Sequence, residues 1–228
     1  MDSGITEFMN IAQKSYPPRH YPTGAAKCAD LTVHLTGLVL AIVGAVFMLV
    51  FCLRSGEIGQ LTAVMIYSAG IIAMLSFSAI YNFAPAVKRP ALRKLDYTGI
   101  FLMIAASYTP FTTQALSGAW AIGMTTAVWS LAAFGIFAKF FMTWLPKKFW
   151  VAFYLLLGWL VVVAAVPMFS SVHWVSLLLL LIGGITYSVG VIFHMMPSLT
   201  FSHAIWHGHV VAAAGTHWAA VLVGVVLV

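Results

Sequence analysis

Seven long apolar runs take up most of this chain, and they restrict it to folds that suit a lipid bilayer. A helix of about 20 apolar residues crosses the hydrocarbon core of a membrane. Hydrophobic residues make up 62% of the sequence and charged residues 7%, against about 25% charged residues in soluble domains. The runs are continuous rather than alternating, which excludes a β-barrel. We therefore predict an all-α integral membrane protein, a bundle of seven transmembrane helices over residues 31–53, 59–82, 95–116, 119–140, 149–169, 174–194 and 203–228.

The positions of the cationic residues predict how this bundle is oriented. The chain has 11 Lys and Arg residues against 5 Asp and Glu residues, a formal net charge of +6. All of the cations but Arg54 fall before the first run, or in or next to connections on the same side of the bundle: Lys14, Arg19, Lys27, Lys88, Arg89, Arg93, Lys94, Lys139, Lys147 and Lys148. Because Lys and Arg accumulate in cytoplasmic loops, we predict a cytoplasmic N-terminus and a C-terminus outside.

The start of the first run divides the chain into an N-terminal arm, residues 1–30, and a seven-helix transmembrane domain, residues 31–228. In the predicted orientation the arm is cytoplasmic. The basic charge then indicates contact with membrane lipid, including anionic headgroups. We expect no nucleic-acid partner, and the sequence identifies no protein partner.

A short histidine cluster opens the last apolar run. His203 and His207 are four residues apart, so on a helix their imidazoles lie on one face, one turn from each other. Such a pair can present two nitrogens to one metal ion. Alternatively, both are interfacial histidines that hydrogen-bond to the backbone or to headgroups. Ionisable groups inside a membrane often mark a functional site, and this pair falls near the predicted cytoplasmic leaflet.

Four polar residues on other runs, His34, Ser78, Asn82 and Asp96, fall near the same leaflet. Asp96 is either a helix N-terminal acid favoured by the helix dipole or a carboxylate that contacts an ion directly or acts on its water as general base. Ser78 and Asn82 share a helix face, and side chains of this kind commonly hydrogen-bond across helix contacts in membranes. We interpret His34 as a packing or capping residue, and His20 as interfacial.

Several short motifs, taken together, identify a family resemblance that covers nearly the whole chain. The chain resembles the hemolysin III family, the bacterial branch of the progestin and adipoQ receptor superfamily. The resemblance rests on the segments Ser78-Ala79-Ile80-Tyr81-Asn82, Lys94-Leu95-Asp96-Tyr97-Thr98-Gly99-Ile100, Ser107-Tyr108-Thr109-Pro110-Phe111, Gly183-Gly184-Ile185-Thr186-Tyr187 and His203-Ala204-Ile205-Trp206-His207, with His217 following.

The resemblance implies a multi-pass protein of the bacterial inner membrane with a zinc ion near the cytoplasmic leaflet. It implies one histidine ligand at the end of the second run and two ligands on the last run, which are His203 and His207 here. An aspartate and a serine of the site correspond to Asp96 and Ser78. The remaining ligand position is occupied by Asn82. Since a carboxamide oxygen is a poor zinc ligand, we expect a weakened Zn²⁺ site unless Asp96 joins the ligands.

Three functions are compatible with these residues. In the first, the protein hydrolyses a lipid amide: the ion polarises the carbonyl, Asp96 accepts a proton from water, and Ser78 helps to hold the oxyanion. In the second, favoured by Asn82, the protein senses lipid state without chemistry, as a receptor-like protein of membrane homeostasis. A pore-forming cytolysin comes last, because the spans carry no continuous polar stripe.

Overall fold

The structure, a computed structural model, describes residues 20–142 and 144–228, and these residues form helices and short connections without any strand. The prediction of an all-α protein is confirmed for this part of the chain. In order, the elements are α2 (Gly24–Ser55), α3 (Ile58–Phe83), α4 (Arg89–Gln114), α5 (Gly118–Phe141), α6 (Lys147–Gly158), η1 (Trp159–Ala164), α7 (Ala165–Ser171), α8 (Trp174–His194), α9 (Ser202–Val221) and η2 (Leu222–Val226).

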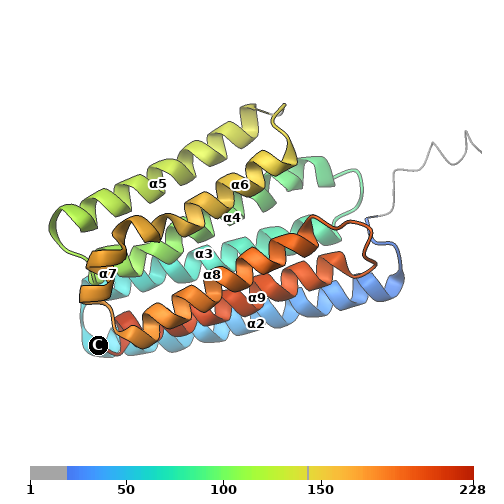
Figure 1. The fold of residues 1–228 in the computed structure, drawn as a ribbon. Coiled ribbons are helices and arrows are strands. Elements are labelled where there is room, and N and C mark those ends of the chain that lie inside the picture. The colour runs from blue at the N-terminus through green and yellow to red at the C-terminus, as the bar shows by residue number, and fades with distance from the viewer. Residues whose placement is uncertain (1–19, 143) are drawn as a thin grey trace, which may run out of the picture.

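The long helices run roughly side by side in a bundle (Figure 1). Helices α2, α8 and α9 lie together on one side, with α2 and α8 both packed against α9, while α5 and α6 lie on the opposite side. Helices α3 and α4 pack against each other between these two groups. The first turns of α2, α4 and α9 and the last turn of α3 lie at the same end of the bundle, so residues far apart in sequence meet there.

Six of the described helical segments are long and apolar enough to cross a membrane: Gly24–Ser55, Ile58–Phe83, Gly118–Phe141, Lys147–Ser171, Trp174–His194 and Ser202–Val226. The protein is therefore a multi-pass membrane protein by the length and composition of its helices. Helix α4 is as long as α3, but its first two turns carry Arg89, Arg93, Lys94 and Asp96. The seventh span and the orientation of the termini stay predictions.

Helix α2 begins earlier than the first apolar run, inside the segment that we predicted as an arm. It starts at Gly24, because the Thr23 hydroxyl oxygen accepts a hydrogen bond from the backbone N–H of Ala26 at 3.1 Å, the usual way to satisfy a helix N-terminus. The additional turns place Asp30 on the helix, where it is completely buried. Residues 1–19 of the predicted arm lie outside the described residues.

The fifth apolar run is divided into α6, η1 and α7 rather than forming one regular helix. Pro167 has no N–H to donate to the carbonyl one turn earlier, which weakens regular α-helix at this point. Tyr108 of α4 contacts the same run one to two turns earlier: its hydroxyl donates to the Gly158 carbonyl at 2.7 Å and accepts from the Val161 N–H at 2.8 Å. The irregular segment is thus fixed to α4 by a side chain that also lines the central cavity.

Candidate metal centre

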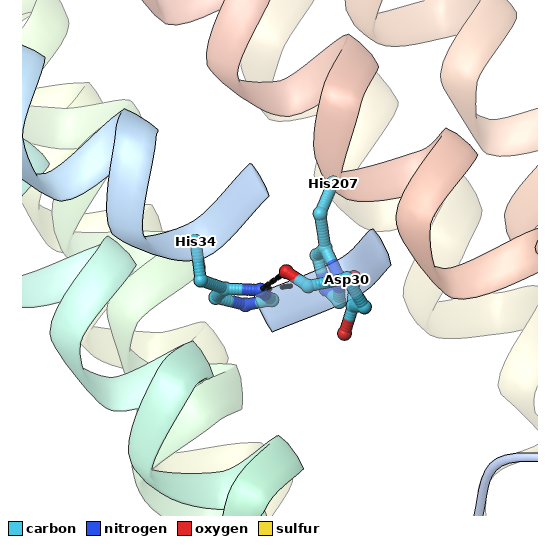
Figure 2. A group of neighbouring side chains, drawn as sticks. All are labelled: Asp30, His34 and His207. Atoms are coloured by element: carbon cyan, nitrogen blue, oxygen red, sulfur yellow. Dashed lines mark hydrogen bonds and ion pairs between the residues drawn. The ribbon is translucent and has the colours of Figure 1, made fainter. Parts of the chain in front are cut away.

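Three buried side chains, Asp30 and His34 of α2 and His207 of α9, form a compact group at the common end of the bundle (Figure 2). One potential ligand atom from each residue lies within 4.8 Å of those of the other two. Asp30 and His34 are four residues apart and so share a face of α2. Because α2 packs against α9, that face meets His207. The group is one that could hold a metal ion.

Asp30 orients both imidazoles. Its carboxylate accepts a hydrogen bond from His207 Nδ1 at 2.6 Å, and its backbone carbonyl accepts one from His34 Nδ1 at 2.9 Å. A carboxylate or a carbonyl only accepts, so each Nδ1 carries a proton, and in a neutral imidazole the lone pair is then on Nε2. Metal-binding histidines commonly donate the other ring N–H to a carboxylate or carbonyl in this way.

The two Nε2 atoms point at the same place. His34 Nε2 lies 3.3 Å, and His207 Nε2 3.4 Å, from the hydroxyl oxygen of Ser78. Asn82 donates to the Ser78 carbonyl at 2.9 Å and to the Ser78 hydroxyl at 3.2 Å. A serine hydroxyl has only one proton to donate, so it satisfies one Nε2 lone pair and leaves the other. Two converging imidazole lone pairs suit zinc or another borderline divalent cation, and the residues present therefore fit such an ion.

The loop before α2 extends this network. The Tyr21 hydroxyl donates to the second carboxylate oxygen of Asp30 at 2.5 Å, and His20 Nε2 donates to the Asn82 side-chain carbonyl at 2.8 Å. Burial lowers the pKa of His20, which favours its neutral form, and burial raises the pKa of Tyr21, which keeps its hydroxyl protonated. The ring centroids of His20 and His203 lie 4.9 Å apart. A continuous set of contacts therefore joins this loop to the histidines of α9.

A cavity of about 880 Å³ opens beside the group and extends between the helices. Its polar end is formed by His34, Ser78, Asn82, Asp96, His203 and His207, and the rest of its wall is mostly apolar, with Met103, Phe111 and Met168 among the lining residues. Cavities of about 300–1,000 Å³ with an apolar wall and a few convergent polar groups are typical of small-molecule sites. The polar end of this cavity is the candidate site.

The structure brings all of the sequence-predicted site residues to this cavity. The Ser78 hydroxyl contacts His34 and His207, and Asn82 contacts Ser78. Asp96 lies near Ser78 and His207. His203 is further out: its ring centroid is 6.4 Å from that of His207, and it does not belong to the compact group of Asp30, His34 and His207. The roles of His203, His207, Asn82 and Asp96 as ligands, and of Asp96 and Ser78 in catalysis, stay predictions.

Sequence reasoning missed Asp30 and gave His34 and His20 lesser roles. Asp30 precedes the apolar run, so the hydropathy pattern placed it outside the bundle. One signal was present in the sequence, because Asp30 and His34 have the same four-residue spacing as His203 and His207. The contact between His20 and Asn82 joins residues 62 positions apart, and no local pattern indicates it.

Comparison with known proteins identifies the family. The model for the family described as "Haemolysin-III related" matches residues 28–218 of this chain. The chain belongs to this family. It is 31% identical to "Hemolysin-3 homolog" of Bacillus subtilis (strain 168), over 85% of this chain and 92% of the relative. It is 32% identical to "Hemolysin-3" of Bacillus cereus, over 78% of this chain and 82% of the relative. The predicted resemblance to the hemolysin III family is confirmed.

The family also has animal relatives. The chain is 28% identical to human "Monocyte to macrophage differentiation factor", over 89% of this chain and 86% of the relative. Asp30, His34, Ser78, Asn82 and His207 all fall within the matched residues 28–218. The loop residues His20 and Tyr21 precede that segment, so the haemolysin-III match covers the candidate metal site but not the loop that contacts it.

Proposed function

We propose that this haemolysin-III family protein is a membrane-embedded metalloprotein that holds a zinc-type divalent cation at the polar end of its cavity and hydrolyses a lipid amide there. The observation that carries the proposal is the convergence of two imidazole Nε2 atoms on Ser78, where a large apolar cavity begins. The cationic connections at this end of the bundle favour a cytoplasmic position, and the bacterial relatives favour the inner membrane.

The ion would be held by the Nε2 atoms of His34 and His207, with the Asp96 carboxylate as the third protein ligand. Two histidines and one carboxylate are a common ligand set of catalytic zinc sites, which keep a further position open. Asp30 is already engaged by His207 and Tyr21, and so acts by fixing the rings. When bound, the ion acts as a Lewis acid that polarises a carbonyl and lowers the pKa of water.

The protein supplies the rest of the chemistry through its own residues. Asp30 keeps both imidazoles in the tautomer with the lone pair on Nε2. The Ser78 hydroxyl lies between the two rings, where it can donate a hydrogen bond to the oxyanion that develops on an attacked carbonyl. One oxygen of the Asp96 carboxylate would hold the ion, and its other oxygen accepts the proton that the attacking water loses and passes it to the amide nitrogen as the C–N bond breaks. The apolar wall binds the lipid chain and holds the scissile bond at the polar end.

Metal content tests the first part of the proposal. The protein, prepared without chelator, is expected to contain zinc by elemental analysis. We expect His34→Ala and His207→Ala each to lose most of it. His173→Ala is the matched control, because His173 is exposed and precedes α8 at the other end of the bundle. Zinc content that neither site substitution changes would refute the metal site.

Hydrolysis is tested separately with purified protein in lipid nanodiscs and a panel of N-acyl lipids. We expect release of the free fatty acid, lost with His207→Ala and reduced by Ser78→Ala. Bound zinc without any release on the panel would support the second function instead, a lipid sensor without chemistry. Asn82 favours that function, because its amide is hydrogen-bonded to His20 and Ser78 and offers the ion no nitrogen lone pair.

A further inference from the structure

A second, smaller cavity lies at the same end of the bundle. It has a volume of about 310 Å³, and its polar lining residues are His20, Lys147, His194, Ser202 and His203. Four lining residues, Lys147, His194, His203 and Trp206, belong to the large cavity as well. The two cavities therefore adjoin, the large one mostly apolar and the small one about half polar.

The small cavity is lined by hydrogen-bond donors, and no carboxylate is among its described lining residues. Lys147 provides a positive charge. Its ammonium group donates one hydrogen bond to the backbone carbonyl of His194 at 2.9 Å, which leaves two further protons for a ligand. In the described part of the chain, Lys147 takes part in no ion pair. The imidazoles of His194 and His203 and the Ser202 hydroxyl can each add one donor, whereas the single N–H of neutral His20 is already donated to Asn82.

A site lined by a lysine cation and several donors, with no carboxylate among its described lining residues, favours an anion. A phosphate group fits this lining better than a carboxylate does. It offers three strongly accepting oxygens and a charge approaching −2, whereas a carboxylate offers two oxygens and a single charge. The apolar cavity next to it fits a hydrocarbon chain. The chemistry of the two cavities together is that of one amphiphile, anionic at one end and apolar at the other.

We propose that the small cavity binds the phosphate headgroup of a lipid whose acyl chain lies in the large cavity. The proposal rests on the proposed function for the lipid nature of the occupant, and it names its class: an acyl lipid with a phosphate headgroup. His203 lines both cavities and is the next ring outward from His207. The headgroup therefore lies next to the proposed metal centre, and the acyl chain of the lipid passes that centre.

The proposal is tested with three probes that share one hydrocarbon chain and differ in the headgroup: hexadecyl phosphate, palmitate and hexadecanol. Each is titrated into the protein in phosphatidylcholine nanodiscs, and its binding is measured. We expect hexadecyl phosphate to bind at least about tenfold more tightly than the other two, because charge-assisted hydrogen bonds distinguish the headgroups. This comparison needs no variant. Palmitate binding as tightly as hexadecyl phosphate would overturn the assignment of a phosphate headgroup.

Two neighbouring lysines provide a matched pair of variants. Lys147→Gln removes the cation of the small cavity, and we expect it to weaken hexadecyl phosphate about tenfold while hexadecanol is unchanged. Lys148→Gln removes an equal charge from the adjacent residue, which is exposed as Lys147 is but is not part of the described lining of either cavity, and should change neither. Equal losses in the two variants would show general surface charge and overturn the proposal.

Two further arms separate this proposal from others. Inorganic phosphate is added as a competitor: full displacement of hexadecyl phosphate at equal concentration would show a site for free phosphate rather than for a lipid. The zinc measurements with His34→Ala and His207→Ala are made on the same preparations. A phosphate preference without zinc binding refutes the metal centre alone, and zinc binding without a phosphate preference refutes the headgroup site alone.

Discussion

Asn82→His is the substitution that tests the metal centre most sharply. Asn82 is buried and makes three hydrogen bonds, one to His20 and two to Ser78. At about 1 kcal/mol for each bond, their loss should lower the free energy of unfolding of the zinc-free protein by about 3 kcal/mol. The imidazole instead brings a nitrogen lone pair next to Ser78, on which His34 and His207 already converge.

The expected gain in zinc affinity follows from the strength of zinc ligands. Structural zinc sites with four ligands bind with about 10–16 kcal/mol, or about 2.5–4 kcal/mol for each ligand. Since about 1.4 kcal/mol corresponds to a factor of ten, one added imidazole should tighten zinc by about 100-fold. At a free zinc concentration near the wild-type Kd, zinc then stabilises the wild type by about 0.4 kcal/mol and the variant by about 2.7 kcal/mol.

The assay is thermal unfolding of both proteins in nanodiscs, with and without buffered zinc. Without zinc the variant should melt well below the wild type, and with zinc most of that difference should disappear. Asn82→Ala is the control, because it loses the same hydrogen bonds and adds no ligand, so zinc should not rescue it. A folded Asn82→His protein whose zinc affinity equals that of the wild type would refute the placement of the ion beside Ser78.

Three further predictions concern the residues around the histidines. Tyr21→Phe removes a buried hydrogen bond to the Asp30 carboxylate and should lower the free energy of unfolding by about 1.5–3 kcal/mol, measured by denaturant titration; an unchanged value would contradict the contact. Asp30→Asn should weaken zinc about 10–100-fold in competition with a chelator while the helix content by circular dichroism stays the same. The pKa of His20 is lowered from 6.5 by burial, so its stabilising contribution should be complete above pH 6.5 and decrease as the pH falls below it. His20→Gln should flatten that part of the pH–stability curve, and an equal slope in both proteins would contradict the burial of His20.

Much of the fold was predictable, because hydropathy over about 20 residues is a local property. The predicted run 174–194 has the same bounds as α8. Where the predicted bounds differ from the structure, one or two individual residues account for the difference. Thr23 begins α2 before the apolar run. Pro167 and the Tyr108 hydroxyl interrupt the fifth run.

The candidate site was predictable where its residues repeat at helical spacing. Ser78 with Asn82, and His203 with His207, lie one turn apart, and all four line the cavity. The pairing of His207 with Asp30 joins residues 177 positions apart and depends on how α2 packs against α9. Helix packing of this kind leaves no periodic signal in the sequence, so Asp30 was missed although it orients both histidines.

The burial of Asp30 is itself an argument that this end of the bundle has a function. Removing a carboxylate from water costs several kcal/mol even after the protein relaxes around it. Tyr21 and His207 offset this cost with two short hydrogen bonds, yet replacing a buried polar group and its partners by apolar residues is often neutral or stabilising. Stability alone therefore does not explain a completely buried aspartate in this helix. Fixing the tautomer of His207 does explain it, because the carboxylate accepts from His207 Nδ1 and so turns the Nε2 lone pair toward Ser78, while the backbone carbonyl of the same residue does this for His34.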